Sequence, residues 1–292
     1  MNEGVNPNKE KLLLILGRHL DLLWTESAIP SSYLPYDIVH KIQPNDWPAM
    51  TSEIVSGQLL AVINGINQFQ TEINSLDAWA RVLPDLSEAE AGSFTISHIS
   101  SVGFFCLNQP YALKERIIHA ATQIIHQGNR RTDRTYPDQL LTDAKSLAKF
   151  VWPKSSEKLK ALGAVGRGRW KSFDTFLGTI ASLNSKEFEL ETIHFRTNAN
   201  HLIPPHLEVG EGPFVTRYMT AHSEMRANGD GTYQLVQEID KIVPAYGFGG
   251  TPPLKIAKAV DHCVTQHTAA TNCYLALVAV IDEILATARI GA

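Results

Sequence analysis

Apolar residues recur every three or four positions along most of this sequence, and this spacing is typical of helices that bury one face. The longest pattern runs from Thr51 to Ile73, and a shorter one covers Lys9 to Trp24. No stretch alternates between apolar and polar residues for long enough to predict a strand, and no repeat period is present. The spacing therefore predicts an all-α helical bundle.

Local signals predict where the helices of the first half begin and end. Four prolines between residues 29 and 48 indicate a loop, with one short helix near Asp37 to Lys41. Pro84 ends the segment after the long helix. Ser87 and Glu90 then form a capping-box pattern ahead of a helix that reaches about Leu107. A separate amphipathic helix is predicted over residues 111–126.

Two polar, turn-rich segments, residues 128–138 and 153–169, predict a boundary near residue 150. We therefore expect an N-terminal helical region over residues 1–150 and a second helical unit over residues 151–292. In the second unit, one helix follows Trp170 and another carries an apolar stripe from Phe188 to Leu202. The latter must stop before the double proline at 204–205, because a residue before proline avoids helical angles.

The remaining signals of the second half are turns and one last helix. Residues 228–231 (NGDG) predict a turn, and residues 246–251 (YGFGGT) predict a glycine loop. Pro252 and Pro253 open a terminal helix that extends towards Arg289, since proline is accepted in a first helical turn.

Composition narrows the class of protein. Hydrophobic residues make up 44% of the chain and charged residues 19%, which fits a packed core. The net charge of -4 argues against a protein coated in nucleic acid but permits a local basic groove. The N-terminus lacks the apolar region of a signal peptide, and the most apolar run, Tyr274–Ile281, is too short to span a bilayer. We expect a soluble, cytoplasmic protein with no membrane partner.

The three cysteines fit that compartment. Their number is odd and their spacing is not that of a metal site, so we expect buried thiols in a reducing cytosol. They are Cys106, Cys263 and Cys273.

Reactive side chains concentrate between residues 191 and 208. Arg196 and His201 lie five residues apart, with Asn198 and Asn200 between them. A histidine with a pKa near 6.5 exchanges protons at neutral pH, and an arginine stabilises a phosphate in the transition state. The asparagines can orient the histidine or donate to phosphate oxygens. Such a set supports metal-independent RNA cleavage, in which the histidine deprotonates a ribose 2′-hydroxyl or protonates the leaving 5′-oxygen.

Helix geometry limits how these residues meet. On an ideal helix Arg196 and His201 are roughly 140° apart, on opposite flanks of the buried stripe. A working site therefore requires a distorted helix end or a second subunit that presents one flank to a shared groove. His194 or His206 is available as a second imidazole. The alternative is structural: Arg196 forms a surface ion pair with Glu191 or Glu208, and His201 caps the helix.

The segment Arg196-Thr-Asn-Ala-Asn-His201 resembles the motif of the HEPN superfamily, in which His follows Arg by four to six residues at a helix end of an all-α core. The resemblance covers roughly residues 165–292. Many HEPN proteins are metal-independent ribonucleases of toxin–antitoxin and anti-phage systems, and other members are inactive binding modules. Family members often carry Asn, Asp or His directly after the arginine, whereas this chain has Thr197 there and Asn198 one position later.

Two basic clusters are candidates for RNA binding. Either could follow an RNA backbone, with Trp170 as a stacking surface, or could be an ordinary solvated loop. The first cluster is Arg130, Arg131 and Arg134, and the second is Arg167, Arg169 and Lys171 beside Trp170.

Other motifs predict little chemistry. Cys263 and His267 share a helix face near His262, but only two ligands are local, so we expect core or surface roles and no metal or cofactor. The glycine-rich runs at 163–169 and 246–251 lack the phosphate-loop pattern.

Two functions from different classes follow. The first is an HEPN-like ribonuclease, dimeric, of toxin or antiviral defence type, which cuts RNA with Arg196 and His201 and acts with an antitoxin or defence partner. The second is a catalytically inactive helical module that binds a partner protein or a nucleotide.

Overall fold

The computed structural model describes residues 7–30, 33–48, 50–143, 153–201, 205–209, 215–248 and 253–287. Helices account for 66% of the structure and strands for 12%, so the predicted helical bundle is accompanied by a small sheet and the fold is not all-α. In chain order the elements are α1 (Pro7–Thr25), α2 (Asp37–His40), η1 (Pro44–Asp46), α3 (Thr51–Val82), η2 (Leu83–Asp85), α4 (Glu88–Phe94), η3 (Thr95–Ile99), α5 (Ser100–Thr132), α7 (Ser155–Gly166), α8 (Phe173–Ile180), α9 (Lys186–Glu191), α10 (Phe195–His201), β1 (Val215–Ala227), β2 (Tyr233–Phe248) and α11 (Ile256–Ala286).

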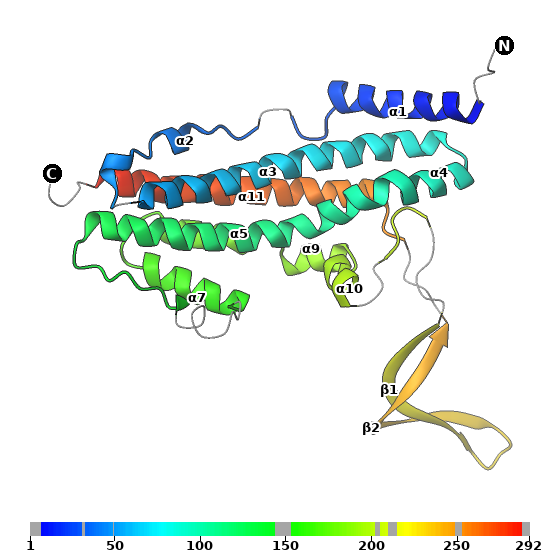
Figure 1. Ribbon diagram of the computed structural model, residues 1–292. Coiled ribbons are helices and arrows are strands. Elements are labelled where there is room, and N and C mark those ends of the chain that lie inside the picture. The colour runs from blue at the N-terminus through cyan, green and yellow to red at the C-terminus, as the bar shows by residue number, and fades with distance from the viewer. Residues whose placement is uncertain are drawn as a thin grey trace, which may run out of the picture.

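Three long helices, α3, α5 and α11, lie side by side and form the centre of the molecule (Figure 1). Helix α1 packs on α3, α7 packs on α5, and α8 packs on α11. One buried apolar cluster contains residues from both sides of position 150. The predicted boundary at residue 150 itself lies outside the described residues, but the two halves share a core.

Helix α3 buries one apolar face, as its apolar spacing predicts. Val55, Leu59, Ile63 and Ile66 are each 0% exposed. The helix continues past the predicted end at Ile73 to Val82, and Pro84 follows in a short 3-10 turn. Burial of this many branched apolar side chains is the main source of stability in a helix of this kind.

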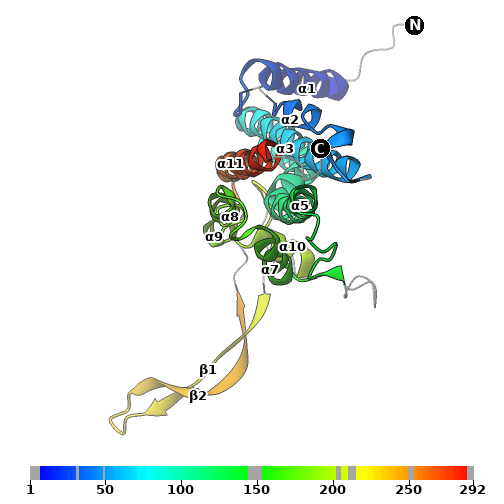
Figure 2. The ribbon, with the colours of Figure 1, turned by 90° about the vertical axis from the view of Figure 1, so that its left-hand side faces the viewer.

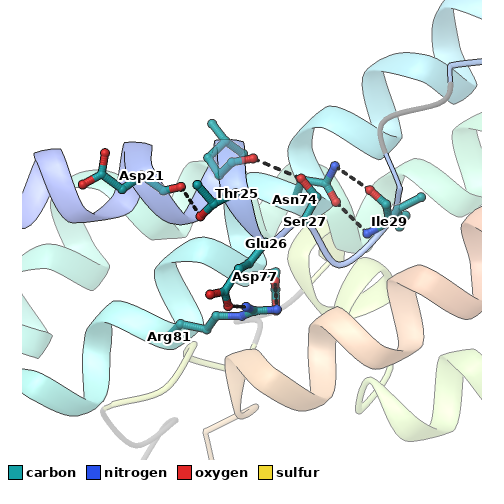
Figure 3. A network of polar contacts seen from close by, with 9 residues as sticks. Asp21, Thr25, Glu26, Ser27, Ile29, Asn74, Asp77 and Arg81 are labelled. Atoms are coloured by element: carbon teal, nitrogen blue, oxygen red, sulfur yellow. Dashed lines mark hydrogen bonds and ion pairs between the residues drawn. The ribbon is translucent and has the colours of Figure 1, made fainter.

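Polar side chains of α3 fasten the segment that follows α1 (Figure 3). The amide of Asn74 accepts a hydrogen bond from the backbone N–H of Ile29 at 2.9 Å and donates to its carbonyl at 3.2 Å. Asn67 forms the same pair of bonds with Leu34, at 2.8 and 3.2 Å. Nearby, Arg81 bridges the carboxylates of Glu26 and Asp77. These buried amides replace the backbone partners that an irregular segment lacks.

Helices α4 and α5 are joined through a π-helical turn, Thr95–Ile99. The predicted capping box is confirmed, because Glu90 accepts from the backbone N–H and the hydroxyl of Ser87. The predicted break between Leu107 and Tyr111 is wrong, since α5 continues through Pro110 to Thr132. Packing against α3 and α11 outweighs the roughly 3 kcal/mol that an interior proline costs a helix.

The segment between α5 and α11 departs from its predicted outline. Residues 155–166, expected to be turn-rich, form α7, and the helix expected from Trp170 begins at Phe173. The single helix expected over residues 188–202 is two helices, α9 and α10, so its continuous apolar stripe is wrong. Leu202 lies outside the described residues. The terminal helix is present as α11, but it begins at Ile256, so Pro253 does not lie in its first turn as predicted.

A long antiparallel hairpin, β1 and β2, projects away from the bundle in both views (Figures 1 and 2). Its strands contain 13 and 16 residues, and neither was predicted. The predicted turn at residues 228–231 is confirmed as the hairpin tip, where Gly229 and Gly231 adopt φ of +79° and +88°. Asp230 accepts hydrogen bonds from the backbone N–H and hydroxyl of Thr232, which closes the turn.

By length and composition α11 is apolar enough to cross a membrane, and 44% of its most apolar window is buried inside the bundle. The run Tyr274–Ile281, judged too short from sequence, is only part of this 31-residue helix. Core helices of soluble proteins have the same composition, so the composition alone does not assign α11 to a membrane.

Candidate functional site

The segment that leads into Arg196 is a tight reversal between α9 and α10. Ile193 and His194 adopt left-handed backbone angles, with φ of +55° and +50°. The Thr192 hydroxyl donates to the carbonyl of Phe188 at 2.7 Å, and the Asn198 amide donates to the carbonyl of Ile193 at 3.0 Å. Left-handed angles are costly for a β-branched residue, so the bonds on either side hold this backbone in place.

Arg196 is the second residue of α10 and lies against α5. Its guanidinium carbon is 3.4 Å from the centre of the Tyr111 ring, and Phe195 beside it packs edge-on against Phe104. Within the described part of the chain, no group accepts a hydrogen bond from the Arg196 side chain. Stacking fixes the plane of the guanidinium while its N–H groups remain available to an anion. Tyr111 was not predicted, because nothing in the sequence links it to residue 196.

The other predicted catalytic residues are only partly assembled around Arg196. Asn200 is exposed on α10, whereas one amide N–H of Asn198 is used in the reversal. His194 and His206 are both exposed. The backbone of His201 ends α10, but its side chain lies outside the described residues. The structure therefore brings Arg196 and Tyr111 together and leaves convergence with His201 a prediction.

The first predicted basic cluster is largely engaged within the bundle. Arg131 is 9% exposed, and it donates to the carbonyl oxygens of Ile284 at 2.7 Å and Thr287 at 2.9 Å. It thus caps the C-terminal end of α11, and this burial removes it from the candidate RNA contacts. Arg130 forms a 2.9 Å ion pair with Asp138. Arg134 also has an interaction partner.

The second cluster lies beside the first. Arg169 is 3.6 Å from the Asp133 carboxylate and 4.6 Å from the centre of the Tyr136 ring. Trp170 is half-buried, and its indole N–H donates to Asn129 at 3.0 Å, so its ring is packed rather than free to stack on a base. The two clusters, treated as separate in the sequence, meet at one end of the bundle and are partly neutralised there.

Arg167 and Lys171 complete the second cluster. Arg167 lines a pocket of about 340 Å³ with Lys160 and the apolar side chains of Leu141 and Leu159. The backbone N–H of Lys171 donates to Glu283 of α11 at 2.8 Å.

The hairpin carries many exposed apolar side chains. None of its described side chains is buried. The register places seven large apolar side chains on one face, each 52–70% exposed. They are Val215, Met219, Met225, Tyr233, Leu235, Ile242 and Tyr246. The period of two that defines this face continues past the bulge between Ala221 and His222.

The opposite face of the hairpin is more polar and carries a charged cluster. Ligand atoms of His222, Glu224 and Glu238 lie within 4.8 Å of one another, which is close enough to share a metal ion. Arg226 pairs with both carboxylates, and Lys241 is 3.9 Å from Glu238. These cations already balance the two negative charges, so the trio forms a charged network rather than a prepared metal site.

The buried thiols and imidazoles of α5 and α11 belong to the core. All three cysteines are free and buried, and burial raises the pKa of the Cys106 and Cys263 thiols. His267 is 9% exposed beside Phe69, and burial lowers its pKa to about 4. His262 instead lies at the surface, 3.7 Å from Glu191. These environments match the expected core and surface roles.

Comparison of the chain with protein-family models, with curated proteins and with solved structures finds no match. The resemblance to the HEPN superfamily therefore rests on the Arg196–His201 motif and its helical setting alone.

Proposed function

We propose that this chain is a binding module, in which the helical bundle holds a β-hairpin arm out to a protein partner. The observation that carries the proposal is the apolar face of the hairpin, which no described part of the chain covers. Contiguous exposed apolar surface on a soluble domain marks an interaction site. Of the two functions predicted from sequence, the binding module fits this surface.

The chemistry of the arm indicates the kind of partner. Over its 13 residues β1 extends about 40 Å, and the apolar face follows that length. Tyr233 and Tyr246 supply rigid side chains of the type that anchors protein interfaces. We expect the partner to offer an apolar helix or sheet face, because the arm has no excess of positive charge for nucleic acid.

A matched pair of charge substitutions tests the arm. Leu235→Lys places a charge on the apolar face, and Gln234→Lys places the same charge one residue away on the opposite face. Cross-linking in the native cells, followed by quantification of the partner, should reveal at least a tenfold loss for Leu235→Lys and little change for Gln234→Lys. Equal capture by both variants would contradict a role for this face.

A metal-independent ribonuclease is the second candidate, and one observation favours it. The Arg196 guanidinium is held flat on Tyr111 with its donors unused by the described residues, which suits a phosphate ligand. In this proposal Arg196 stabilises the phosphorane-like charge and His201 acts as general acid or base. Asn198 and Asn200 assist, and a second copy or a partner protein completes a site of toxin or defence type.

RNA cleavage in the presence of a chelator tests this candidate. His201→Ala should reduce the rate by ~10²–10⁴, which is the typical contribution of a positioned acid or base. Tyr111→Phe should keep the arginine stacked and active, whereas Tyr111→Ala should not. His262→Ala is the matched control on the surface of α11. If varied RNAs remain intact, or if His201→Ala cleaves at the wild-type rate, the chain is not such a nuclease.

A further inference from the structure

The two outer edges of the hairpin differ in how they are protected. The edge of β2 carries Pro244, and three extra residues, Ile239 to Lys241, bulge from it. Proline, bulges and lysine are the devices that block a strand edge against further pairing. Strand β1 contains no proline, glycine or lysine, and the extra residues of the bulge are not on its side. Among the described residues, none of these devices therefore protects the edge of β1.

The backbone groups on the open edge can be identified. Pro244 has no N–H and is opposite Met219, so this pair is not hydrogen-bonded and Met219 points its own N–H outward. At the other end, the N–H of Asn228 donates across the hairpin to Thr232 at 2.9 Å. Bonded and outward positions alternate along a strand. The Met219–Pro244 pair and the Asn228–Thr232 bond therefore give the same result. The odd-numbered residues of β1, from 215 to 227, point their N–H and C=O groups away from β2.

Pairing with a further strand would stabilise a hairpin that is exposed in this way. Two-stranded hairpins are marginally stable in water, and three or more strands, or packing against a helix, are needed for independent stability. Here none of the described strand residues is buried, so the bundle does not supply that packing.

Charge and symmetry indicate which kind of strand pairs with the edge of β1. The hairpin has three basic residues and four acidic ones, so it does not attract a polyanion such as RNA. Antiparallel pairing of β1 with an identical strand about a two-fold axis at Ala221 overlaps all 13 residues, from Val215 opposite Ala227. In this register Glu224 is opposite Tyr218 and Arg217 is opposite Met225. Each charged residue of β1 meets an uncharged one, so no like charges repel.

We propose that β1 pairs edge to edge with β1 of a second copy of this chain, which makes a four-stranded antiparallel sheet with strand order β2–β1–β1–β2. A two-fold axis perpendicular to the sheet keeps the apolar faces of both hairpins on the same side. The dimer thereby doubles the apolar surface. This proposal concerns the strand edge and goes beyond the proposed function, which concerns the face.

Hydrogen exchange and sedimentation of the full-length protein test the pairing. In the dimer, amides of odd-numbered β1 residues should become protected as the protein concentration rises, with the same midpoint as the change in mass. Even-numbered amides are bonded within the hairpin and should already exchange more slowly than the odd-numbered ones at the lowest concentration, which reports that the hairpin forms. Exchange of the odd-numbered amides at unprotected rates at every concentration would overturn the proposal.

A substitution at an outward position sharpens the test. Ser223→Pro removes an outward N–H and leaves the cross-hairpin bonds in place, and Ser223→Ala is the matched control that retains the N–H. Because symmetry doubles the loss, the dimer dissociation constant should rise about tenfold or more for the proline variant alone. Unchanged dimerisation of Ser223→Pro, with even-numbered amides still protected, would also overturn the proposal. Leu235→Lys leaves the edge intact, so failure of the face and failure of the edge are distinguishable.

Discussion

The bundle buries many of its apolar side chains, whereas the hairpin exposes its own. Leu59 and Ile63 of α3 are 0% exposed, whereas Leu235 and Tyr246 of the hairpin are 62% and 70% exposed. The three long helices of the bundle bury one apolar face each within the chain, whereas no described side chain of the hairpin is buried. The difference indicates that the helical part is specified by its own contacts, while the hairpin depends on what it meets.

The largest expected effect is the loss of folding stability when a buried ring of the bundle is removed. The same truncation of an exposed ring in the hairpin serves as the comparison. Phe69→Ala removes a fully buried ring and should lower the free energy of unfolding by ~3–5 kcal/mol. Tyr233→Ala, at 65% exposure, should change it by less than about 0.5 kcal/mol. Urea denaturation measures both. A large loss for Tyr233→Ala at low protein concentration would mean that the hairpin packs on the bundle after all.

The buried imidazole of His267 should make the stability of the bundle depend on pH. Its folded pKa is lowered to about 4 by burial, below the unfolded value, so the unfolded chain binds more protons in between. The stabilisation is full above about pH 6.5 and is lost as the pH falls towards 4. At pH 5 we expect the free energy of unfolding to be roughly 2 kcal/mol lower than at pH 7.

His267→Phe should flatten this profile, since an apolar ring suits the space beside Phe69. A weaker dependence of the unfolding free energy on pH should remain, because burial also lowers the pKa of His19 and His119. His262→Gln, on the surface of the same helix, is the control and should keep the full slope. An unchanged profile for His267→Phe would contradict the assignment.

A smaller effect is expected where α3 holds the segment after α1. Asn74→Ala leaves the buried N–H and C=O of Ile29 without partners and should cost ~1–2 kcal/mol. Asn64→Ala removes an exposed bond to the Tyr36 hydroxyl and should cost less than about 0.5 kcal/mol. Thermal unfolding distinguishes them, and equal losses would mean that the segment is not held by Asn74.

Sequence reasoning succeeded where one helix face is apolar and failed where tertiary contacts decide. The spacing of Leu59, Val62 and Ile66 predicts α3, and Ser87 with Glu90 predicts the start of α4. The hairpin was missed because its alternation is interrupted: Arg217 and Ser223 lie on the apolar face, and Tyr218 lies on the polar one. The NGDG turn was found, but no strands were assigned to its sides.

The candidate site was likewise predicted only in part, because some of its features depend on tertiary contacts. The sequence placed Arg196 and His201 within one helix end, and both belong to α10. It could not anticipate the left-handed angles of Ile193 and His194, because no glycine or asparagine marks these two positions, nor the stack of Arg196 on Tyr111 from α5. Likewise, the sequence indicates that Arg131 is a solvated charge, because the carbonyls of Ile284 and Thr287 that accept its hydrogen bonds are more than 150 residues away in the chain.

The smallest expected effect is on the bundle when the hairpin is removed. Replacement of residues 215–248 by a short glycine–serine linker should change the unfolding free energy of the bundle by less than about 0.5 kcal/mol, because no described strand residue is buried. The same deletion should abolish the self-association expected of β1 and any partner binding by the apolar face. Urea denaturation and sedimentation of one sample measure both properties. A bundle that unfolds at lower urea without the hairpin would show that the two regions are one cooperative unit, and the contrast between them would then be one of exposure but not of stability.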